Sequence, residues 1–508
     1  MRSNISNPLT TTASATPHTA RRAHTVADWG PLALLTTLLL LFIWPVALPA
    51  SASARPGETV FFEAPSDLIE VTPQTRGKAL EQLQWLGVKA LRVELAWRNV
   101  APSPTSVHMP SFDAANPASY AWGNYDALLA EAQRLKWPVL LTVTAPVPKW
   151  ATAAKKDYVT YPSARDFKEF MTAVGRHYGS EASLFAIWNE PNHPAFLLPQ
   201  FLPSGKPASP HIYRSLFAAG YEGLQASGIT RPKVLMGETA PFGSDSITSQ
   251  EAKTNPLHDV APLAFLREAL CLNSQYHASG TCDELHPYGY SHHAYTVGSP
   301  TYKPEGRDNV TIGVLPRLSS ALDKAATAHA IPARLPIYLT EFGIQSYPNR
   351  QLGVPQPKQA QYDAIAEQIA WSDPRVAAFS QYLLHDDKLG GKPGSSVHGS
   401  FIGFQTGLVE YSGKRKPLYY GFPVPLVVSH RHRGGYSIWV LVRPATAQTK
   451  LTVLAESSRG HHWRVLRMLT TKANGSWSFD SSTSALAWRV RWQSPSGHVY
   501  EGPPIAVS

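Results

Sequence analysis

Short hydrophobic runs alternate with longer amphipathic stretches from residue 59 to about residue 384. Eight runs have the length and composition of β-strands: Thr59–Phe62, Ala90–Val93, Val139–Val143, Leu184–Trp188, Val234–Met236, a stretch ending at Tyr295, Pro336–Leu339 and Val376–Leu384. Between them, hydrophobic residues recur three and four positions apart, which predicts helices over Gln74–Leu86, Tyr125–Leu135, Ala164–Tyr178, Ile212–Ala226, Val314–Ala328 and Lys358–Trp371. This alternation is typical of an α/β fold with a parallel sheet.

Eight strand–helix units predict a (β/α)8 barrel, or TIM barrel, with long loops. A doubly wound open sheet is the alternative. That fold usually has a glycine-rich nucleotide-binding turn after its first strand, and no such turn follows Phe62. We therefore expect residues 55–422 to form the barrel.

The pattern changes near Pro423. Short alternating strands follow, separated by turn sequences such as Ala-Asn-Gly, and they are predicted at Tyr436–Val442, Lys450–Ala455, Trp463–Leu469, Trp477–Phe479 and Ala487–Trp492. Short strands with regular turns are typical of a β-sandwich. Residues 423–508 are thus expected to form a small all-β domain.

Residues 1–54 have the pattern of an export signal. A polar stretch that contains Arg21 and Arg22 precedes an apolar run from Pro31 to Ala50, and small residues follow up to Ala54. Signal peptidase prefers small residues of this kind, so cleavage is expected after Ala52 or Ala54 and the protein is expected to be secreted. An uncleaved membrane anchor, which would hold the protein at the cell surface, is the alternative.

Composition excludes several classes of protein. The 508 residues are 43% hydrophobic and 16% charged, which rules out disorder, collagen and coiled coil for most of the chain. Only two cysteines are present, Cys271 and Cys282. Outside the cytoplasm they can form a disulfide across a short loop, and they are too few for a cysteine-rich zinc site.

The net charge of +10 is concentrated in the C-terminal domain. Residues 423–508 contain ten Lys and Arg against three acidic residues, and four tryptophans follow residue 460. One interpretation is contact with an anionic cell-wall polymer, with charge supplying attraction and aromatic rings stacking on sugars. The other is that the tryptophans fill the core and the basic residues are solvated. Nucleic-acid binding fits the charge, but expected export and the lack of any nucleic-acid motif argue against it.

Two carboxylates follow predicted strands directly. Glu190 comes after Leu184–Trp188, and Glu341 comes after Pro336–Leu339. In a TIM barrel, catalytic side chains lie at the C-terminal ends of the strands. Two carboxylates facing each other there are the minimum for glycoside hydrolysis, because one protonates the departing oxygen while the other attacks the sugar or activates water. Asn189 is placed to hold a sugar hydroxyl.

Two further residues were expected to support an ionised Glu341. Tyr295, after the sixth strand, could donate a hydrogen bond to its carboxylate. Arg92, in the second strand, could do so and also favour the charged form. Glu94 and Glu238 were interpreted as ordinary residues of the barrel rim, and Trp150 and Trp97 as rings that either stack on sugars or pack beneath loops.

Four short motifs resemble those of one group of enzymes. Trp-Asn-Glu-Pro-Asn at 188–192 and Leu-Thr-Glu-Phe-Gly at 339–343 resemble the fourth- and seventh-strand signatures of clan A glycoside hydrolases. These are retaining barrel enzymes that include families 5 and 39. The pair His293 and Tyr295 is similar to the sixth-strand motif, and Leu91-Arg92-Val93 is similar to the second-strand arginine motif. Together the motifs span about 250 residues in the expected order.

The resemblance implies hydrolysis of β-linked O-glycosidic bonds in a polysaccharide or oligosaccharide, with no metal or organic cofactor. It makes Glu190 the acid/base and Glu341 the nucleophile, with Asn189, Arg92, His293 and Tyr295 supporting them. Trp150, from its place after the third strand and not from the resemblance, is a further candidate for contact with the sugar. Two positions depart from the pattern: the third strand ends in Thr144-Ala145-Pro146 without a histidine, and the eighth ends in Gln381-Tyr382 without a tryptophan. These departures leave the identity of the sugar undetermined. A transglycosidase and a non-catalytic polysaccharide-binding protein remain alternatives, and the sequence gives no oligomeric state.

Overall fold

The computed structural model describes residues 58–255, 257–350, 352–389, 403–458 and 461–507. The predicted export signal lies outside these residues. Among the described residues, the helices are too short or too polar to cross a membrane.

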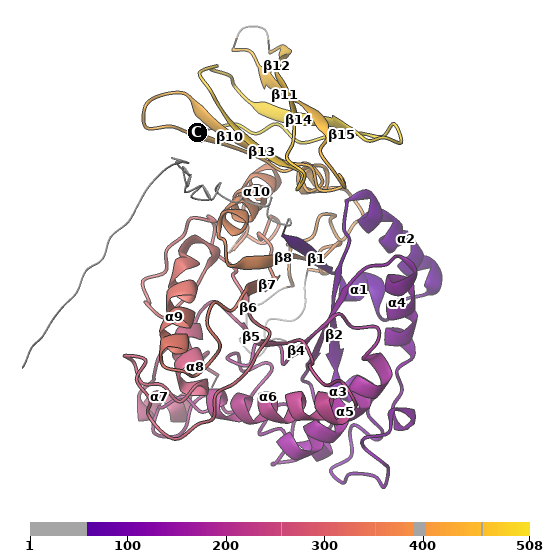
Figure 1. Cartoon of the computed structure of the whole chain (residues 1–508), viewed down its shortest axis with the longest axis vertical. Coiled ribbons are helices and arrows are strands. Elements are labelled where there is room, and N and C mark those ends of the chain that lie inside the picture. The colour runs from indigo at the N-terminus through magenta and orange to yellow at the C-terminus, as the bar shows by residue number, and fades with distance from the viewer. Residues whose placement is uncertain (1–57, 256, 351, 390–402, 459–460, 508) are drawn as a thin grey trace, which may run out of the picture. The chain divides into compact units, whose positions relative to one another are not determined.

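Eight parallel strands close into a barrel in chain order (Figure 1). Their bounds are β1 (Thr59–Glu63), β2 (Leu91–Ala96), β3 (Val139–Thr144), β4 (Leu184–Ile187), β5 (Val234–Thr239), β6 (Gly289–His293), β7 (Ile337–Glu341) and β8 (Val376–Tyr382). The barrel closes where β1 pairs with β8, from Thr59 opposite Ala378 to Glu63 opposite Tyr382. The predicted barrel and its eight strands are therefore confirmed, and the open sheet is excluded.

Six helices correspond to the predicted amphipathic stretches: α2 (Pro73–Trp85), α4 (Gly123–Arg134), α5 (Ala164–Tyr178), α6 (Ser209–Ala226), α9 (Pro316–Thr327) and α10 (Gln356–Ser372). In α5, Ser163 caps the N-terminus by accepting a hydrogen bond from the Asp166 backbone N–H. The hydrophobic side chains of α5, such as Phe167 and Phe170, are buried against the barrel.

The other helices are short, and the hydrophobic pattern did not single them out. They are α1 (Pro65–Leu68), α3 (Trp97–Val100), α7 (Ser249–Thr254), α8 (Pro262–Ala269) and α11 (Pro417–Gly421), with single turns η1 (Pro117–Ser119), η2 (Lys149–Ala151) and η3 (Ile312–Val314). A helix of one or two turns contains too few residues for a 3.6-residue period to be recognised.

Side chains alternate between the two faces of each barrel strand. In β2, Leu91, Val93 and Leu95 belong to the main core between strands and helices. Inside the barrel, an apolar layer fills the N-terminal half and is made of Phe61, Ala90, Leu140, Ala186, Leu235, Tyr338 and Ala378. The residues two positions after Phe61 and Ala90 are Glu63 and Arg92, so the next layer of the interior is polar.

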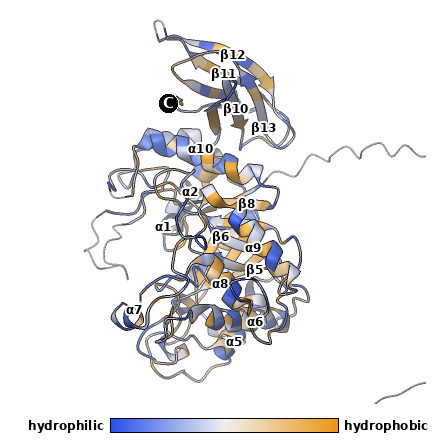
Figure 2. Ribbon diagram, turned by 90° about the vertical axis from the view of Figure 1, so that its left-hand side faces the viewer, coloured by the Kyte–Doolittle hydropathy of each residue, from blue (hydrophilic) through white to orange (hydrophobic). Residues whose placement is uncertain are grey.

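The C-terminal region forms two antiparallel sheets, as predicted. Their orders are β13-β10-β9 and β12-β11-β14-β15. The bounds are β9 (Leu426–His430), β10 (Tyr436–Leu441), β11 (Lys450–Glu456), β12 (Trp463–Thr470), β13 (Ser476–Ser481), β14 (Trp488–Gln493) and β15 (Val499–Glu501). Hydrophobic and hydrophilic residues are mixed along these strands (Figure 2), and buried positions alternate with more exposed ones in β11 and β14.

One core joins the two C-terminal sheets. It contains Val428 and Ile438 from one sheet and Val453 and Trp488 from the other. The change from barrel to β domain falls between Tyr382 and Leu426. The predicted boundary at residue 423 lies within this interval and stays a prediction.

Candidate active site

Polar and charged side chains gather at the C-terminal ends of the barrel strands. Glu63 ends β1, Arg92 and Glu94 lie in β2, Glu238 lies near the end of β5, His293 ends β6 and Glu341 ends β7, while Asn189 and Glu190 follow β4 directly. Because these ends meet at one end of a parallel barrel, residues far apart in sequence come together there.

The backbone is unusual at the same strand ends. Trp188, Glu190 and Glu238 have φ angles of 72°, 37° and 48°, in the left-handed region that residues other than glycine rarely adopt. The register also shifts between Gly237 and Thr239 and again between His292 and His293. Strain and irregular pairing of this kind concentrate at functional sites, where they aim particular side chains.

Arg92 is the centre of the cluster, and its side chain is fully buried. Nη1 donates to Glu63 and, at 3.2 Å, to Oε2 of Glu341. Nη2 donates to Oδ1 of Asn189 and to Oε2 of Glu238, both at 2.7 Å, and Nε donates to Oε1 of Glu238 at 3.3 Å. One guanidinium therefore holds groups from four other strands or strand ends.

Glu190 contacts a different partner. Its Oε1 lies 2.9 Å from Nδ1 of His293, and its backbone N–H donates to the carbonyl of Glu238 at 3.0 Å. Burial raises the pKa of Glu190 to about 7, although Arg92 opposes the shift. A carboxyl group with such a pKa can both give and take a proton near neutral pH.

Glu341 is held by three groups. The Tyr295 hydroxyl donates to Oε1 at 2.7 Å, and Oε2 lies 3.2 Å from Nη1 of Arg92 and 3.5 Å from Nδ1 of His293. Burial raises the pKa of Glu341, and His293, Arg92 and the Tyr295 hydrogen bond all oppose that rise. The expected contacts from Tyr295 and Arg92 are thus present.

His293 lies between the two carboxyl groups. It is completely buried, and burial lowers the pKa of its imidazole, which favours the neutral ring. The same nitrogen, Nδ1, contacts Glu190 and Glu341. Asn189 is anchored nearby, since its backbone N–H donates to Oγ1 of Thr144 at 2.9 Å.

Three carboxyl groups of the cluster were missed or misjudged from the sequence. Glu238 is fully buried and also accepts a hydrogen bond from Thr142 at 3.2 Å, so it is not an ordinary rim residue. Glu94 lies beside Arg92. Glu63 directly follows the hydrophobic run that ends at Phe62. A carboxylate just after a predicted strand was the signal that singled out Glu190 and Glu341, and the same signal selects Glu63.

The structure does not bring Trp150 to this cluster. Its side chain is buried, donates from Nε1 to the carbonyl of Pro102 at 3.2 Å, and packs edge-on against Trp97 and Phe112. Packing beneath the loops accounts for Trp150 and for the fully buried Trp97, so neither offers a free ring face to a sugar.

Other aromatic side chains lie closer to the carboxyl pair. Tyr295 stacks on Phe342 and on Phe404, with ring centroids 6.1 Å apart in both cases. Tyr382, at the end of β8, packs edge-on against Phe404 at 5.0 Å and is half-buried. Burial and the nearby Glu341 carboxylate raise the pKa of the Tyr382 hydroxyl. Tyr382 thus provides an aromatic side chain at the end of the eighth strand, where the sequence has no tryptophan.

The predicted disulfide is present between Cys271 and Cys282 and closes the short loop after α8. Among the described residues, His, Cys, Asp and Glu form no group that could hold a metal ion.

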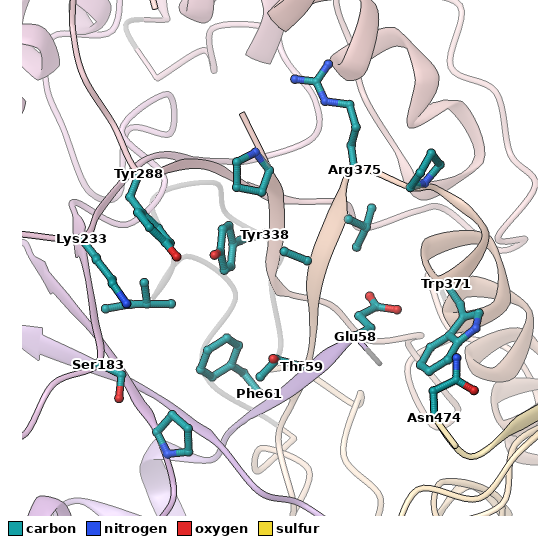
Figure 3. A pocket seen from close by; sticks show the side chains of 16 residues that line it. Glu58, Thr59, Phe61, Ser183, Lys233, Tyr288, Tyr338, Trp371, Arg375 and Asn474 are labelled. Atoms are coloured by element: carbon teal, nitrogen blue, oxygen red, sulfur yellow. The ribbon is translucent and has the colours of Figure 1, made fainter. Parts of the chain in front are cut away.

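A cavity of about 470 Å³ opens at the opposite end of the barrel. Its lining includes Thr59, Leu184 and Val376, the first residues of β1, β4 and β8. Figure 3 shows Lys233, Tyr288 and Arg375 around it. The apolar layer of the barrel interior separates this cavity from Glu190 and Glu341, so it is not the candidate active site.

No protein-family model and no curated protein matches the sequence. Solved structures with a similar course of the chain include a family 39 glycoside hydrolase from the gut symbiont Bacteroides cellulosilyticus WH2, at 15% identity and a TM-score of 0.47, covering 84% of this chain and 80% of that one. A glucosidase from Croceicoccus marinus has 11% identity and a TM-score of 0.48 over 85% and 94% of the two chains. A hyperthermophilic β-glucosidase from Pyrococcus furiosus has 13% identity and a TM-score of 0.41 over 68% and 82%.

Proposed function

We propose that this protein is a secreted retaining glycoside hydrolase that cleaves β-linked O-glycosidic bonds in a polysaccharide or oligosaccharide. One observation carries the proposal: Nδ1 of His293 lies 2.9 Å from Oε1 of Glu190 and 3.5 Å from Oε2 of Glu341. Because both oxygens contact the same nitrogen, Oε1 of Glu190 and Oε2 of Glu341 can be no farther apart than these two contact distances added together. Carboxyl groups are about 5–5.5 Å apart in retaining enzymes and about 6.5–9.5 Å apart in inverting ones, so the geometry favours retention.

In the first step, an oxygen of Glu341 attacks the anomeric carbon and forms an ester bond to the sugar. The glycosidic C–O bond breaks, its electron pair goes to the departing oxygen, and Glu190 protonates that oxygen. The three contacts to Glu341 from Tyr295, Arg92 and His293 favour its ionised form. Glu190 lacks a hydrogen bond from Arg92 and its pKa of about 7 suits a proton donor.

In the second step, a water oxygen attacks the same carbon while Glu190, now a carboxylate, takes the water proton. The ester bond breaks and its electron pair returns to Glu341. The enzyme is restored, and the sugar leaves with the configuration it had in the substrate. No step needs a metal or organic cofactor.

Two alternatives use the same cluster of side chains. A transglycosidase would form the same ester and pass the sugar to an acceptor hydroxyl instead of water. A non-catalytic polysaccharide-binding protein would bind without bond cleavage, but nothing in binding alone explains two carboxyl groups held on one imidazole nitrogen.

The test is cleavage of a panel of aryl glycosides and of plant and microbial polysaccharides by the protein from residue 55. Glu341→Ala should lower release about a thousandfold or more, because the nucleophile is lost. Glu131→Ala removes a carboxylate exposed on α4 and should leave release unchanged. Equal release by the wild type and Glu341→Ala would contradict the assignment, and binding of a glycan without any release would favour the non-catalytic alternative.

Secretion is part of the proposal and rests on the sequence of residues 1–54. N-terminal sequencing of the protein from the culture medium should find a start after Ala52 or Ala54. Intact chains confined to the membrane fraction would favour the anchored alternative.

Contact of the C-terminal domain with an anionic cell-wall polymer also stays a proposal. Trp488 and Trp492 lie in the domain core, and Arg443 is buried against Glu367 at 2.8 Å, so these residues serve packing. Several basic residues of the domain are exposed, and two of them, Arg464 and Arg467, lie together on β12. Sedimentation of the whole protein with insoluble cell walls should weaken with added salt and in an Arg464→Ser/Arg467→Ser variant. Absence of binding at every salt concentration would contradict this contact.

A further inference from the structure

Glu94 belongs to the carboxyl cluster, yet among the described residues no hydrogen bond holds it. It lies in β2 two residues after Arg92, so its side chain has the same inward direction and is one step nearer the C-terminal end of the barrel. The residues on either side, Val93 and Leu95, belong to the core outside the barrel. Glu94 therefore faces the interior in the layer above Arg92.

The donors of Arg92 are already occupied by Glu63, Glu341, Asn189 and Glu238. Oε1 of Glu94 lies 3.8 Å from Nη2, beyond hydrogen-bond distance, and this oxygen is buried with no partner among the described residues. Even so, 28% of the Glu94 side chain is exposed, compared with 16% for Glu190 and 9% for Glu341. Of these three, Glu94 is the most open to a ligand.

The surroundings keep Glu94 in its neutral form near neutral pH. Burial raises its pKa to about 8, helped by the nearby carboxyl groups of Glu341, Glu238 and Glu190 and opposed by Arg92. A neutral carboxyl group has one O–H donor and acceptor oxygens. A sugar hydroxyl, which also donates and accepts, is a matching partner.

We propose that Glu94 is a substrate-binding residue of this carboxyl cluster and that its carboxyl group binds a hydroxyl group of the sugar whose glycosidic bond is cleaved. The proposal rests on the proposed function and extends it. It also predicts the class of sugar. Four carboxyl groups lie within 3.8 Å of the Arg92 guanidinium, and its donors are already occupied, so a neutral sugar fits and a uronate, whose carboxylate would find no free donor on Arg92, does not.

The experiment measures kcat and KM for the 4-nitrophenyl β-glycoside that the wild type cleaves fastest, for its monodeoxy analogues, and for the corresponding glucuronide. The variants are Glu94→Ala, the isosteric Glu94→Gln, and Glu131→Ala as the surface control. Glu94→Ala should lower kcat/KM about ten- to hundredfold, and Glu94→Gln, which still donates and accepts, should lower it less than about tenfold.

The deoxy series separates contact from a structural effect. One analogue lacks the hydroxyl that Glu94 binds. The wild type should cleave it with a kcat/KM about ten- to hundredfold lower than that for the parent glycoside, whereas Glu94→Ala should cleave the two with nearly equal kcat/KM, because the two changes remove the same contact. An unchanged kcat/KM for Glu94→Ala, an equal loss on every analogue, or a glucuronide cleaved fastest by the wild type would overturn the proposal. Full activity of Glu341→Ala would instead overturn the proposed mechanism, so the two failures are distinguishable.

Discussion

The two ends of the barrel interior are built by the same eight strands but have opposite character. At the N-terminal end, Phe61, Leu140 and Leu235 belong to an apolar layer. At the C-terminal end, Arg92 is surrounded by carboxyl groups such as Glu238 and Glu341. Along β1 and β2 the two layers are two positions apart: Glu63 comes two residues after Phe61, and Arg92 comes two residues after Ala90.

The contrast between the apolar and the charged layer indicates which end of the barrel carries the function. Apolar filling stabilises a barrel, whereas taking charged groups out of water costs several kcal/mol for each ion unless partners compensate. A protein selected for stability alone would continue the apolar layer. The left-handed backbone at Glu190 and Glu238 adds strain at the same end, so both costs fall where the proposed chemistry takes place.

The largest effect is expected from breaking the charged layer at its centre. Arg92→Met should lower the free energy of unfolding by about 3–5 kcal/mol at pH 8, because Glu63 and Glu238 lose their cation, and it should abolish glycoside cleavage. The loss of stability should shrink at pH 5, where Glu63, whose pKa burial raises well above its usual value, is more fully protonated and needs its cation less. Urea unfolding at both pH values measures it.

Leu140→Ala is the matched change in the apolar layer. It should cost about 2–5 kcal/mol, and this cost should be the same at pH 5 and pH 8 because no titratable group loses a partner. A cost for Arg92→Met that does not depend on pH would contradict the comparison between the two layers.

A smaller and more selective effect is expected at Glu190. Glu190→Ala removes the proton donor and should slow cleavage of glycosides with poor leaving groups about 100- to 10,000-fold. Substrates whose leaving group needs no proton, such as 2,4-dinitrophenyl glycosides, should form the ester nearly normally, and added azide should restore turnover by replacing the activated water. The same loss for every leaving group, without rescue by azide, would exclude Glu190 as the acid/base.

The smallest expected effect is on the pH dependence of stability. Glu94 and Glu190 have pKa values raised to about 8 and about 7, above the value of about 4.3 expected in an unfolded chain. At a pH between the unfolded-state and folded-state pKa values, the folded state binds protons that the unfolded state has released. The contribution of these groups to the free energy of unfolding is therefore fully present below the unfolded-state pKa and is lost as the pH rises through the folded-state pKa values.

We expect the wild type to be less stable at pH 8 than at pH 5, and Glu94→Gln to reduce that difference. Thermal unfolding across this pH range measures it. Higher stability at pH 8 would show that the carboxyl cluster is ionised when folded.

Much of the architecture was predictable from the sequence, because the barrel repeats a simple pattern. Val139–Val143 and Ala164–Tyr178 were placed within a residue of the observed β3 and α5, since a buried strand and an amphipathic helix each have a clear period. The short helix α8 was not singled out, and neither was β15, whose three residues are too few for a pattern.

The candidate site was predicted in part. Glu190, Glu341, Arg92 and Tyr295 come together as the strand-end rule suggests, because parallel strands bring their C-terminal ends to one place. The strand-end rule cannot show which residues point inward, so it leaves Glu238 as an ordinary rim residue and leaves Trp150 between stacking on a sugar and packing beneath loops. Those distinctions depend on strand register and loop packing, which link residues far apart in sequence.

The central claim is the retaining mechanism with Glu341 as nucleophile, and the most direct measurement is the configuration of the sugar when it is first released. Proton NMR during cleavage of the best β-glycoside resolves the two anomers before they interconvert. We predict that the β-anomer forms first and the α-anomer appears only later, by mutarotation. Initial release of the α-anomer would mean a single displacement by water, and would contradict both the covalent ester and the role assigned to Glu341.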